Sequence, residues 1–285
     1  MSQSEITHIS DTALWVAAYR AMETDRSDSL FKDPLAKVLA GDLGFRIVKK
    51  MPGGTANAWV LVVRTKIIDD FILNAVEKKG VDLVLNLAAG LDTRPYRLAL
   101  PPSLHWIEVD FPKLIDYKEA RIGDEKPFCH LQRIKMDLSD RAARVGLFYK
   151  LNREFKNILV LTEGFLVYLN SFDVESLAKD ISEQKNFKLW IQDHYSALSI
   201  KMINKRWKRQ MKKTPFQFTP PDWIDFFKRH GWKVVENRWT IPESVKLNRK
   251  MPYFWFYRFM TIFASRSRMK KMRELSGFAL FERTT

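Results

Sequence analysis

Residues 81–90, VDLVLNLAAG, constrain the fold of this chain more than any other segment. The run is apolar, contains β-branched valines and closes on Gly90, as a buried strand does when it enters a tight turn. A second apolar run, LHWIEVD at 104–110, ends on the acid Asp110. Short buried strands that alternate with helical segments predict parallel pairing, because parallel neighbours need a crossover connection.

The same alternation continues along the chain. A strand is expected at the start of 157–169, and the helical stretch DVESLAKDISEQ follows it. Further strands are expected at 130–140, 187–195, 231–239 and 277–285. The pattern predicts an α/β fold with a doubly wound, mostly parallel sheet of seven strands.

Helical periodicity dominates the residues before the first strand. The stretch SDTALWVAAYRAMETDR predicts an amphipathic helix near the N-terminus. Residues 31–42 predict a short helix that begins at Pro34 and ends at Gly41. Residues 58–80 predict a long helix that ends at Gly80, because glycine commonly takes the left-handed conformation after a helix.

Charge is divided unevenly along the chain. Residues 1–200 contain 27 Lys and Arg against 27 Asp and Glu, whereas residues 201–285 contain 21 against 6, which accounts for the whole net charge of +15. Within this basic third, 199–216 predicts an amphipathic basic helix and 253–264 is aromatic. One interpretation is a lid over the substrate. Another is peripheral contact of 199–273 with an anionic membrane, whereas nucleic acid is disfavoured because no binding module is recognisable.

Cys129 is the only cysteine, so no intrachain disulfide can form and a reducing compartment is expected. No secretory signal and no apolar run long enough to cross a bilayer is found, so a cytoplasmic location is expected. The five histidines are scattered and show no metal-ligand spacing, so no metal site is predicted. The sequence does not indicate an oligomeric state.

Gly90 and Asp110 together indicate a nucleoside site. A glycine directly after the first strand lets the main chain approach a ligand, and an acid at the end of the next strand can accept hydrogen bonds from a ribose diol. The single glycine lacks the G-x-G-x-x-G spacing of a dinucleotide loop, which favours S-adenosylmethionine over a nicotinamide cofactor. Alternatively, the stretch is only a turn into a helix, capped by Asp92 or Thr93.

Three motifs carry a family resemblance: LNLAAGLDTRPYRL (85–98), WIEVDFPKLIDYK (106–118) and VLTEGFLVYL (160–169). In this order they resemble the leucine carboxyl methyltransferase-like family of S-adenosylmethionine-dependent methyltransferases, and within it the bacterial O-methyltransferase branch. The resemblance covers roughly residues 10–195 and is weak beyond them.

The resemblance implies one methyltransferase domain over 1–285, with the Rossmann-like class I methyltransferase fold and helical insertions near the C-terminus. It implies a helical cap over 1–80, a cofactor-binding core over 81–195, and a lid region with the last strands over 196–285. S-adenosylmethionine is the implied cofactor.

Cofactor contacts are implied by motif. Arg64 resembles the arginine that holds the cofactor's carboxylate, Gly90 the glycine under the cofactor and Asp110 the ribose-binding acid. Glu163 resembles the acid near the amino-acid tail and the methyl group, and Arg20 a basic residue of the cap.

On the adenine side, Asp137 and Leu138 resemble the pair whose acid reaches the exocyclic amine. The family pattern has glycine where this chain has Ala88, and the added methyl group narrows the approach to the cofactor. Arg94 and Arg97 are interpreted as a structural pair with Asp92 or Glu108.

The predicted function is O-methylation of a carboxylate or hydroxyl on a small-molecule or lipid-like acceptor. A carboxylate needs no general base, whereas a hydroxyl does. Candidates for that base are Tyr168, His194 and Tyr195, and the sequence does not decide among them. Two rival functions are a nicotinamide oxidoreductase and a catalytically silent module that binds a membrane or a partner.

Overall fold

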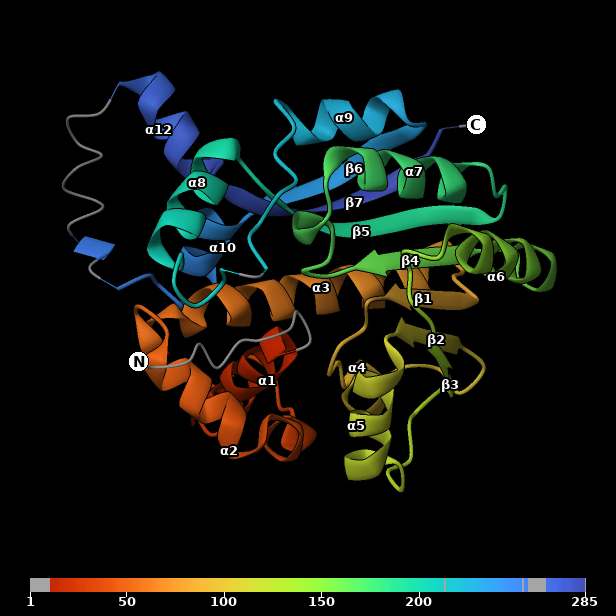
Figure 1. The fold of residues 1–285 in the computed structure, drawn as a ribbon, viewed down its shortest axis with the longest axis horizontal. Helices are drawn as coiled ribbons and strands as arrows, with labels where there is room; N and C mark the ends of the chain where they lie inside the picture. The colour runs from red at the N-terminus through yellow and green to blue at the C-terminus, as the bar shows by residue number, and fades with distance from the viewer. Residues whose placement is uncertain (1–10, 213, 253, 256–264, 285) are drawn as a thin grey trace.

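The computed structural model describes residues 11–212, 214–252, 254–255 and 265–284. Its centre is one seven-stranded sheet with the order β3-β2-β1-β4-β5-β7-β6 (Figure 1). Only β7 runs against the other strands, because it pairs antiparallel with both β5 and β6. The predicted doubly wound, mostly parallel sheet is therefore confirmed. The strands are β1 (Leu83–Leu87), β2 (His105–Asp110), β3 (His130–Lys135), β4 (Ile158–Thr162), β5 (Phe187–Tyr195), β6 (Trp232–Trp239) and β7 (Ser276–Arg283).

Helices cover both faces of the sheet (Figure 1). One face packs against α6 (Arg141–Glu154), α7 (Ser171–Ser182) and α9 (Trp223–Arg229). The other packs mainly against α3 (Ala58–Lys79), with α10 (Thr240–Lys246) beside it. Every residue of β1 and β4 is buried, which explains why both central strands are apolar apart from Asn86 and Thr162.

The helical cap was predicted over 1–80; in the structure α1 (Asp11–Thr24) and α2 (Pro34–Lys50) pack closely on each other as a cap, whereas α3 packs against the sheet. Pro34 begins α2 and Gly41 interrupts it, as predicted, and a second helical segment follows the interruption. Gly41 has φ 51° and ψ −176°, so it kinks the helix, which then continues to Lys50. The second segment, which was not predicted from the sequence, packs its apolar residues against α1.

Shorter helices complete the layers. They are α4 (Arg94–Arg97), α5 (Pro112–Ile122), α8 (Ala197–Arg206), α12 (Arg266–Arg273) and the 3-10 turns η1 (Gly54–Asn57) and η2 (Leu166–Tyr168). The basic helix expected over 199–216 is shorter than predicted, because α8 ends at Arg206. The aromatic stretch 253–264 lies outside the described residues except for 254 and 255. None of the helices in the described part of the chain is long and apolar enough to span a bilayer.

Strand order places a binding crevice. β1 is flanked by β2 on one side and β4 on the other, so the chain reverses its direction of travel across the sheet between β1 and β4. In such sheets the loops at the carboxyl ends of the two strands separate and leave a crevice. The loops after β1, β2, β4 and β5 carry most of the residues singled out by motif.

Candidate active site

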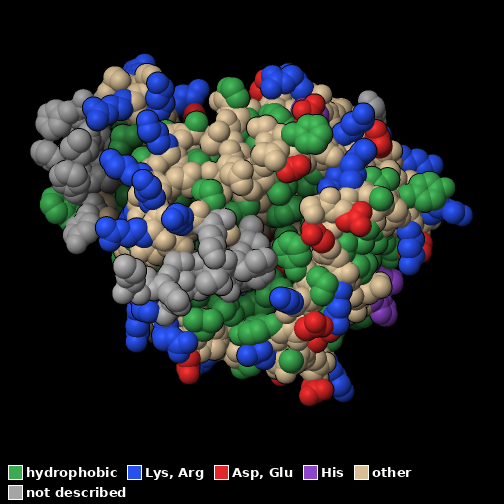
Figure 2. Space-filling view, in the orientation of Figure 1, with side chains coloured by type: hydrophobic (Ala, Val, Ile, Leu, Met, Phe, Trp, Pro, Cys, Tyr) green, Lys and Arg blue, Asp and Glu red, His purple; other side chains and the backbone are tan. Residues whose placement is uncertain are grey.

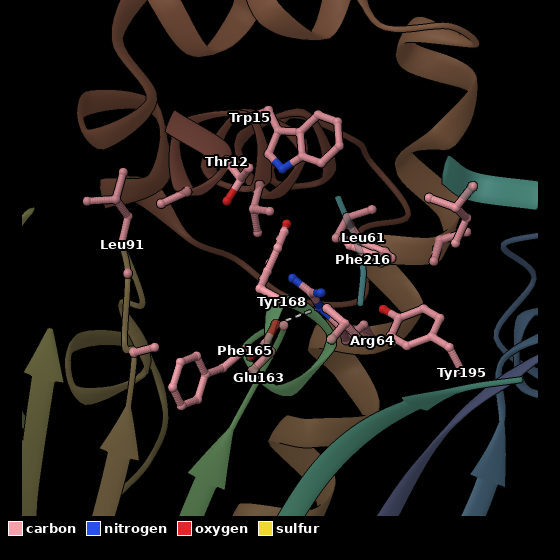
Figure 3. A pocket seen from close by; sticks show the side chains of 18 of the residues that line it. Thr12, Trp15, Leu61, Arg64, Leu91, Glu163, Phe165, Tyr168, Tyr195 and Phe216 are labelled. Atoms are coloured by element: carbon pink, nitrogen blue, oxygen red, sulfur yellow. Dashed lines mark ion pairs between the residues drawn. The ribbon is translucent and has the colours of Figure 1, made fainter. Parts of the chain in front are cut away.

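A cavity of about 770 Å³ lies at the carboxyl ends of these strands (Figure 3). Its floor comes from the loops after β1, β2 and β4, and its roof from α1, which contributes Thr12 and Trp15 (Figure 3). Helix α3 supplies Leu61 and Arg64 to the wall, and Tyr195 and Phe216 line the part beyond β5. The size is typical of a small-molecule or cofactor site.

Gly90 and Asp110 meet at the end of the cavity above β1 and β2. The Gly90 amide donates to Asp110 Oδ2 at 2.7 Å, and the Phe111 amide donates to Oδ1 at 2.7 Å. Each carboxylate oxygen keeps a further lone pair, so Asp110 can still accept from two hydroxyl groups. Gly90 has φ +56°, a conformation that strains residues with a Cβ, and Ala13 of the cap lies against it.

Asp110 has an environment that disfavours its charge. Burial raises the pKa of its carboxyl, and the two backbone amides only partly oppose this effect. Lys118, which carries a positive charge nearby, is bound instead to Glu108 at 2.7 Å. A ligand that donates hydrogen bonds to the ionised Asp110 carboxylate would therefore stabilise its buried charge.

Glu163 occupies the middle of the cavity floor, directly after β4 (Figure 3). Its Oε2 accepts from Arg94 Nη1 at 2.7 Å, and its Oε1 lies 2.8 Å from Arg64 Nε without the alignment of a hydrogen bond. Burial by itself would raise the pKa of Glu163, but Arg94 and Arg64 outweigh it, so the pKa is lowered. Glu163 is therefore an anion facing the cavity.

The arginine of α3 contacts two acids rather than lying on the surface. Arg64 is buried, and its Nη1 is 3.6 Å from Asp193 Oδ2 at the end of β5. Gly164 leaves room for the Arg64 guanidinium, because a Cβ at residue 164 would come within 3.1 Å of Arg64 Nη1. Arg64 thus joins the ends of β4 and β5 at the centre of the cavity.

A chain of buried ion pairs continues from this centre into the cap. Arg94 contacts Asp92 at 2.8 Å and Asp69 at 2.7 Å, and Arg97 binds the other oxygen of Asp69 at 2.7 Å. Asp92 is the partner predicted for Arg94, and that pairing is confirmed. Glu108 is not a partner of either arginine, so that alternative is wrong; it binds Lys118 and Arg133 on the far side of β2.

Arg20 of α1 ties the cap to the first loop. Its Nη2 donates to the Leu91 carbonyl at 2.5 Å, and its Nε pairs with Asp33 at 2.8 Å. Asp33 also accepts from the Thr93 hydroxyl at 2.6 Å. Arg20 lines the cavity, but its hydrogen bonds show that it also holds the Gly90 loop against α1.

Two of the predicted cofactor residues lie outside this cavity. Asp137 is exposed, and its Oδ1 accepts from the Ser139 amide at 2.9 Å, which closes a turn after β3. Leu138 is buried in the core beneath that turn. Their predicted contact with adenine stays a prediction, whereas Arg20, Arg64, Gly90, Asp110 and Glu163 all line the cavity.

The three candidates for a general base are placed differently. Tyr168 and Tyr195 line the cavity, and the Tyr195 hydroxyl donates to Asp193 Oδ2 at 2.9 Å. His194 points to the opposite side of β5, where Nε2 lies 2.8 Å from Asn237 Oδ1 and its ring packs on Trp223 and Trp239. Burial lowers the pKa of His194 to about 4.

Sequence reasoning did not name several lining residues. Asn86 and Phe111 also line the cavity, and α1 supplies Thr12 and Trp15. The sequence could have indicated Asn86, because it is a polar residue inside an apolar strand. In the structure its amide donates to Asp92 at 2.9 Å. The α1 residues carried no such signal, because only the folded cap brings them over the strand ends. Within the described residues no cluster of acids, histidines and cysteine suits a metal ion.

Comparison with known proteins identifies the family. The model of the leucine carboxyl methyltransferases matches residues 13–182. The chain belongs to the leucine carboxyl methyltransferase family. The family resemblance is confirmed, and with it the enzyme class, an S-adenosylmethionine-dependent methyltransferase, and the cofactor.

Two relatives illustrate the extent of the similarity. A Streptomyces coelicolor protein classed among the S-adenosyl-L-methionine-dependent methyltransferases is 33% identical over 187 residues, which cover 61% of this chain and 64% of that protein. A Frankia alni protein of the same class is 28% identical over 264 residues, 85% of this chain and 89% of its own. The chain thus spans slightly less than two thirds of the Streptomyces relative.

Solved structures support the fold. A DUF574 family protein from Streptomyces avermitilis aligns with a TM-score of 0.58 and 11% identity over 94% of this chain and 97% of its own. A protein from Thermobifida fusca classed as a methyltransferase also aligns with a TM-score of 0.58, at 13% identity, over 96% and 94%. At this identity the likeness shows the Rossmann-like fold and nothing about the acceptor.

Proposed function

We propose that this leucine carboxyl methyltransferase family member transfers the methyl group of S-adenosylmethionine to a carboxylate oxygen of a small-molecule acceptor. The acid–base character of the cavity carries the proposal. Its hydroxyl groups are proton donors rather than bases, and its acids are engaged with arginines or with backbone amides.

The cofactor fits the end of the cavity above β1, β2 and β4. Asp110 would accept from the ribose hydroxyls while Gly90 lies under the nucleoside. Glu163 and Arg64 present an anion and a cation to the amino-acid tail, which carries an ammonium and a carboxylate. When bound, the sulfonium supplies an electrophilic methyl carbon. The role of Asp137 and Leu138 on the adenine side stays a prediction.

The tyrosines indicate how an acceptor would be held. Burial raises the pKa of Tyr168 to about 12, and burial also raises the pKa of Tyr195 well above its usual value. Both hydroxyls therefore stay protonated at neutral pH; that of Tyr168 suits a hydrogen bond to an acceptor carboxylate, whereas that of Tyr195 donates to Asp193. Neither is suited to remove a proton from an acceptor hydroxyl.

The transfer to a carboxylate needs no base. An acceptor oxygen forms a bond to the methyl carbon while the carbon–sulfur bond breaks and its electron pair stays on sulfur. No proton is exchanged, and the products are a methyl ester and a neutral thioether. The chain's contribution is alignment and exclusion of water, for which α1 and α8 cover the strand ends.

The linkage of the transferred methyl group distinguishes the two acceptor chemistries. The protein should be incubated with methyl-labelled S-adenosylmethionine and a panel of carboxylic acids, phenols and alcohols. Label that mild alkali releases as volatile methanol is a methyl ester, whereas an ether retains it. We expect alkali-labile label and a rate that is nearly flat around neutral pH. Alkali-stable label with a rate that rises with pH would show hydroxyl methylation instead.

The rival functions are less well supported. Membership of a methyltransferase family does not favour a catalytically silent module, and the strand-end loop lacks a dinucleotide fingerprint. No structural observation supports the predicted membrane contact of 199–273, although basic side chains do gather over α8 and α12 (Figure 2). Two of those cations, Lys205 and Arg206, line the cavity, and their position indicates a more specific role.

A further inference from the structure

The cations that line the cavity divide into paired and unpaired groups. Arg20, Arg64 and Arg94 are each bound to a buried acid. Lys205 and Arg206, on the last turn of α8, also line the cavity, but neither forms an ion pair with any described residue. The lining acids Asp92, Asp110 and Glu163 all follow strands β1, β2 and β4. Among the described residues, no acid therefore compensates the positive charge at the end of the cavity beneath α8.

Arg206 is placed at this end by its surroundings. Its Nη2 lies against the turn before α3, where a Cβ added to Gly53 would come within 2.3 Å of it. Asn57 at the end of the same turn also lines the cavity. Gly53 has φ +92°, a backbone conformation that favours glycine at this turn.

An apolar wall separates this cationic end from the tyrosines. Leu61 of α3 and Met202, Ile203 and Trp207 of the α8 segment line it, and Trp15 packs edge-on against Trp207 with ring centroids 5.1 Å apart. In Figure 3, Tyr168 stands between the loop that carries Leu91 and the side that carries Leu61 and Tyr195. The cavity thus has a cofactor half and an acceptor half.

The length of the acceptor half can be estimated from residue positions along α8. Ser199 lines the cavity four residues after Tyr195 in the sequence, and Arg206 lies seven residues further along α8. At a helical rise of about 1.5 Å per residue, the cations are roughly 10 Å beyond the tyrosine end. A carboxylate at the tyrosines leaves its apolar body along the wall and its far end beside Lys205 and Arg206.

We propose that the acceptor is an elongated apolar dianion, methylated on the carboxylate beside Tyr168 and Tyr195 and held by a second anionic group at Lys205 and Arg206. This inference rests on the proposed carboxyl methylation and adds the second recognition point. It also uses the charge surplus of the last third of the sequence, part of which α8 brings to the cavity.

Three acids of graded length and charge test the proposal. Decanedioic acid has a second carboxylate about as far away as the cations, decanoic acid lacks that group, and hexanedioic acid is too short to reach. Binding of each acid to the complex with S-adenosylhomocysteine is measured by calorimetry, and methyl transfer to each is measured by kcat/KM. Binding needs no turnover, so it reports on the second site even if the chemistry is misassigned.

Two double variants of α8 and the turn after it provide a matched comparison. Lys205→Ala/Arg206→Ala removes the lining cations, whereas Lys208→Ala/Arg209→Ala removes an equal charge from exposed residues that do not line the cavity. We expect wild type to bind decanedioic acid about tenfold more tightly than decanoic or hexanedioic acid, as two partly solvated ion pairs would give. That preference should vanish in the first variant and persist in the second.

The outcomes separate the two proposals. Equal binding of decanedioic and decanoic acids by wild type, no binding of any acid, or a preference that survives Lys205→Ala/Arg206→Ala would each overturn the second anion site. An equal loss in both variants would also overturn it, because general attraction by the basic surface would then suffice. If the binding preference appears as expected but no methyl ester forms, the anion site stands and carboxyl methylation fails.

Discussion

The two halves of the cavity are built in opposite ways. The cofactor half takes its acids from the ends of neighbouring parallel strands and matches each buried arginine to a carboxylate. The acceptor half takes apolar and aromatic side chains from α1, α3 and α8, and its cations are unpaired among the described residues. The cofactor half is therefore held together by internal ion pairs, whereas the cations of the acceptor half are available to pair with a ligand.

This contrast explains where stability and specificity reside. A buried ion network is costly to break, because the remaining partner stays buried without compensation. Exposed cations contribute little to folding, and on the proposal made above they select the acceptor together with the apolar wall. Substitutions in the two halves should consequently separate folding, cofactor binding and acceptor selection.

The largest effect is expected at Arg94, which joins Asp69, Asp92 and Glu163. Arg94→Met leaves these carboxylates without their shared cation, so the free energy of unfolding should fall by about 3–5 kcal/mol. Denaturant unfolding measures this, with exposed Arg209→Met as the control. A loss below about 1 kcal/mol would mean that the network does not hold the cofactor half together.

Asp110→Ala should weaken binding of S-adenosylhomocysteine about 100-fold, since it removes charge-assisted hydrogen bonds worth about 1.5–3 kcal/mol each. Calorimetry measures the affinity, and thermal unfolding checks that the variant folds. Asp137→Ala, on an exposed turn outside the cavity, should change the affinity less than threefold. If Asp137→Ala weakened the affinity as much as Asp110→Ala, the cofactor site would have to include the turn after β3.

The pH dependence of cofactor binding sharpens the assignment to Asp110. Burial raises the pKa of Asp110, while Arg94 and Arg64 outweigh burial at Glu163 and lower the pKa there. As pH falls, Asp110 takes up a proton first, so affinity for S-adenosylhomocysteine should decline above the usual range of an aspartate. The limiting slope is about tenfold per pH unit. Asp110→Asn should abolish this acid limb, and its persistence would assign the decline to another group.

The smallest effect is expected at Ala88, where this chain departs from the family's glycine. Ala88 lines the cavity and has φ 55°, a left-handed conformation that costs a residue with a Cβ about 1 kcal/mol. Ala88→Gly should raise the free energy of unfolding by up to about 1 kcal/mol, whereas Ala89→Gly should lower it. Destabilisation by Ala88→Gly would show that the methyl group packs usefully rather than straining the loop.

The two halves of the cavity also differ in how much of them the sequence predicts. Strand-end residues such as Gly90, Asp110 and Glu163 follow apolar runs at fixed points of the topology, so local pattern places them at one edge of the sheet. The strands themselves are predictable for the same reason. The break of α2 at Gly41 is predictable as well, but the helical segment after it is not, because that segment depends on packing against α1.

The acceptor half could not be predicted from local pattern. Trp15, Leu61 and Ile203 read as ordinary apolar positions of amphipathic helices, and only tertiary packing turns them toward one cavity. His194 shows the opposite error. Its neighbour Tyr195 faces the cavity, but alternation along β5 directs the histidine to the other side of the sheet.

A crystal structure of the protein with S-adenosylhomocysteine tests the central claim most directly. The account predicts both ribose hydroxyls within hydrogen-bonding distance of the Asp110 carboxylate, the nucleoside against the Gly90 main chain, and the sulfur atom facing Tyr168 and Tyr195. A nucleoside bound elsewhere, or one whose ribose does not contact Asp110, would contradict it.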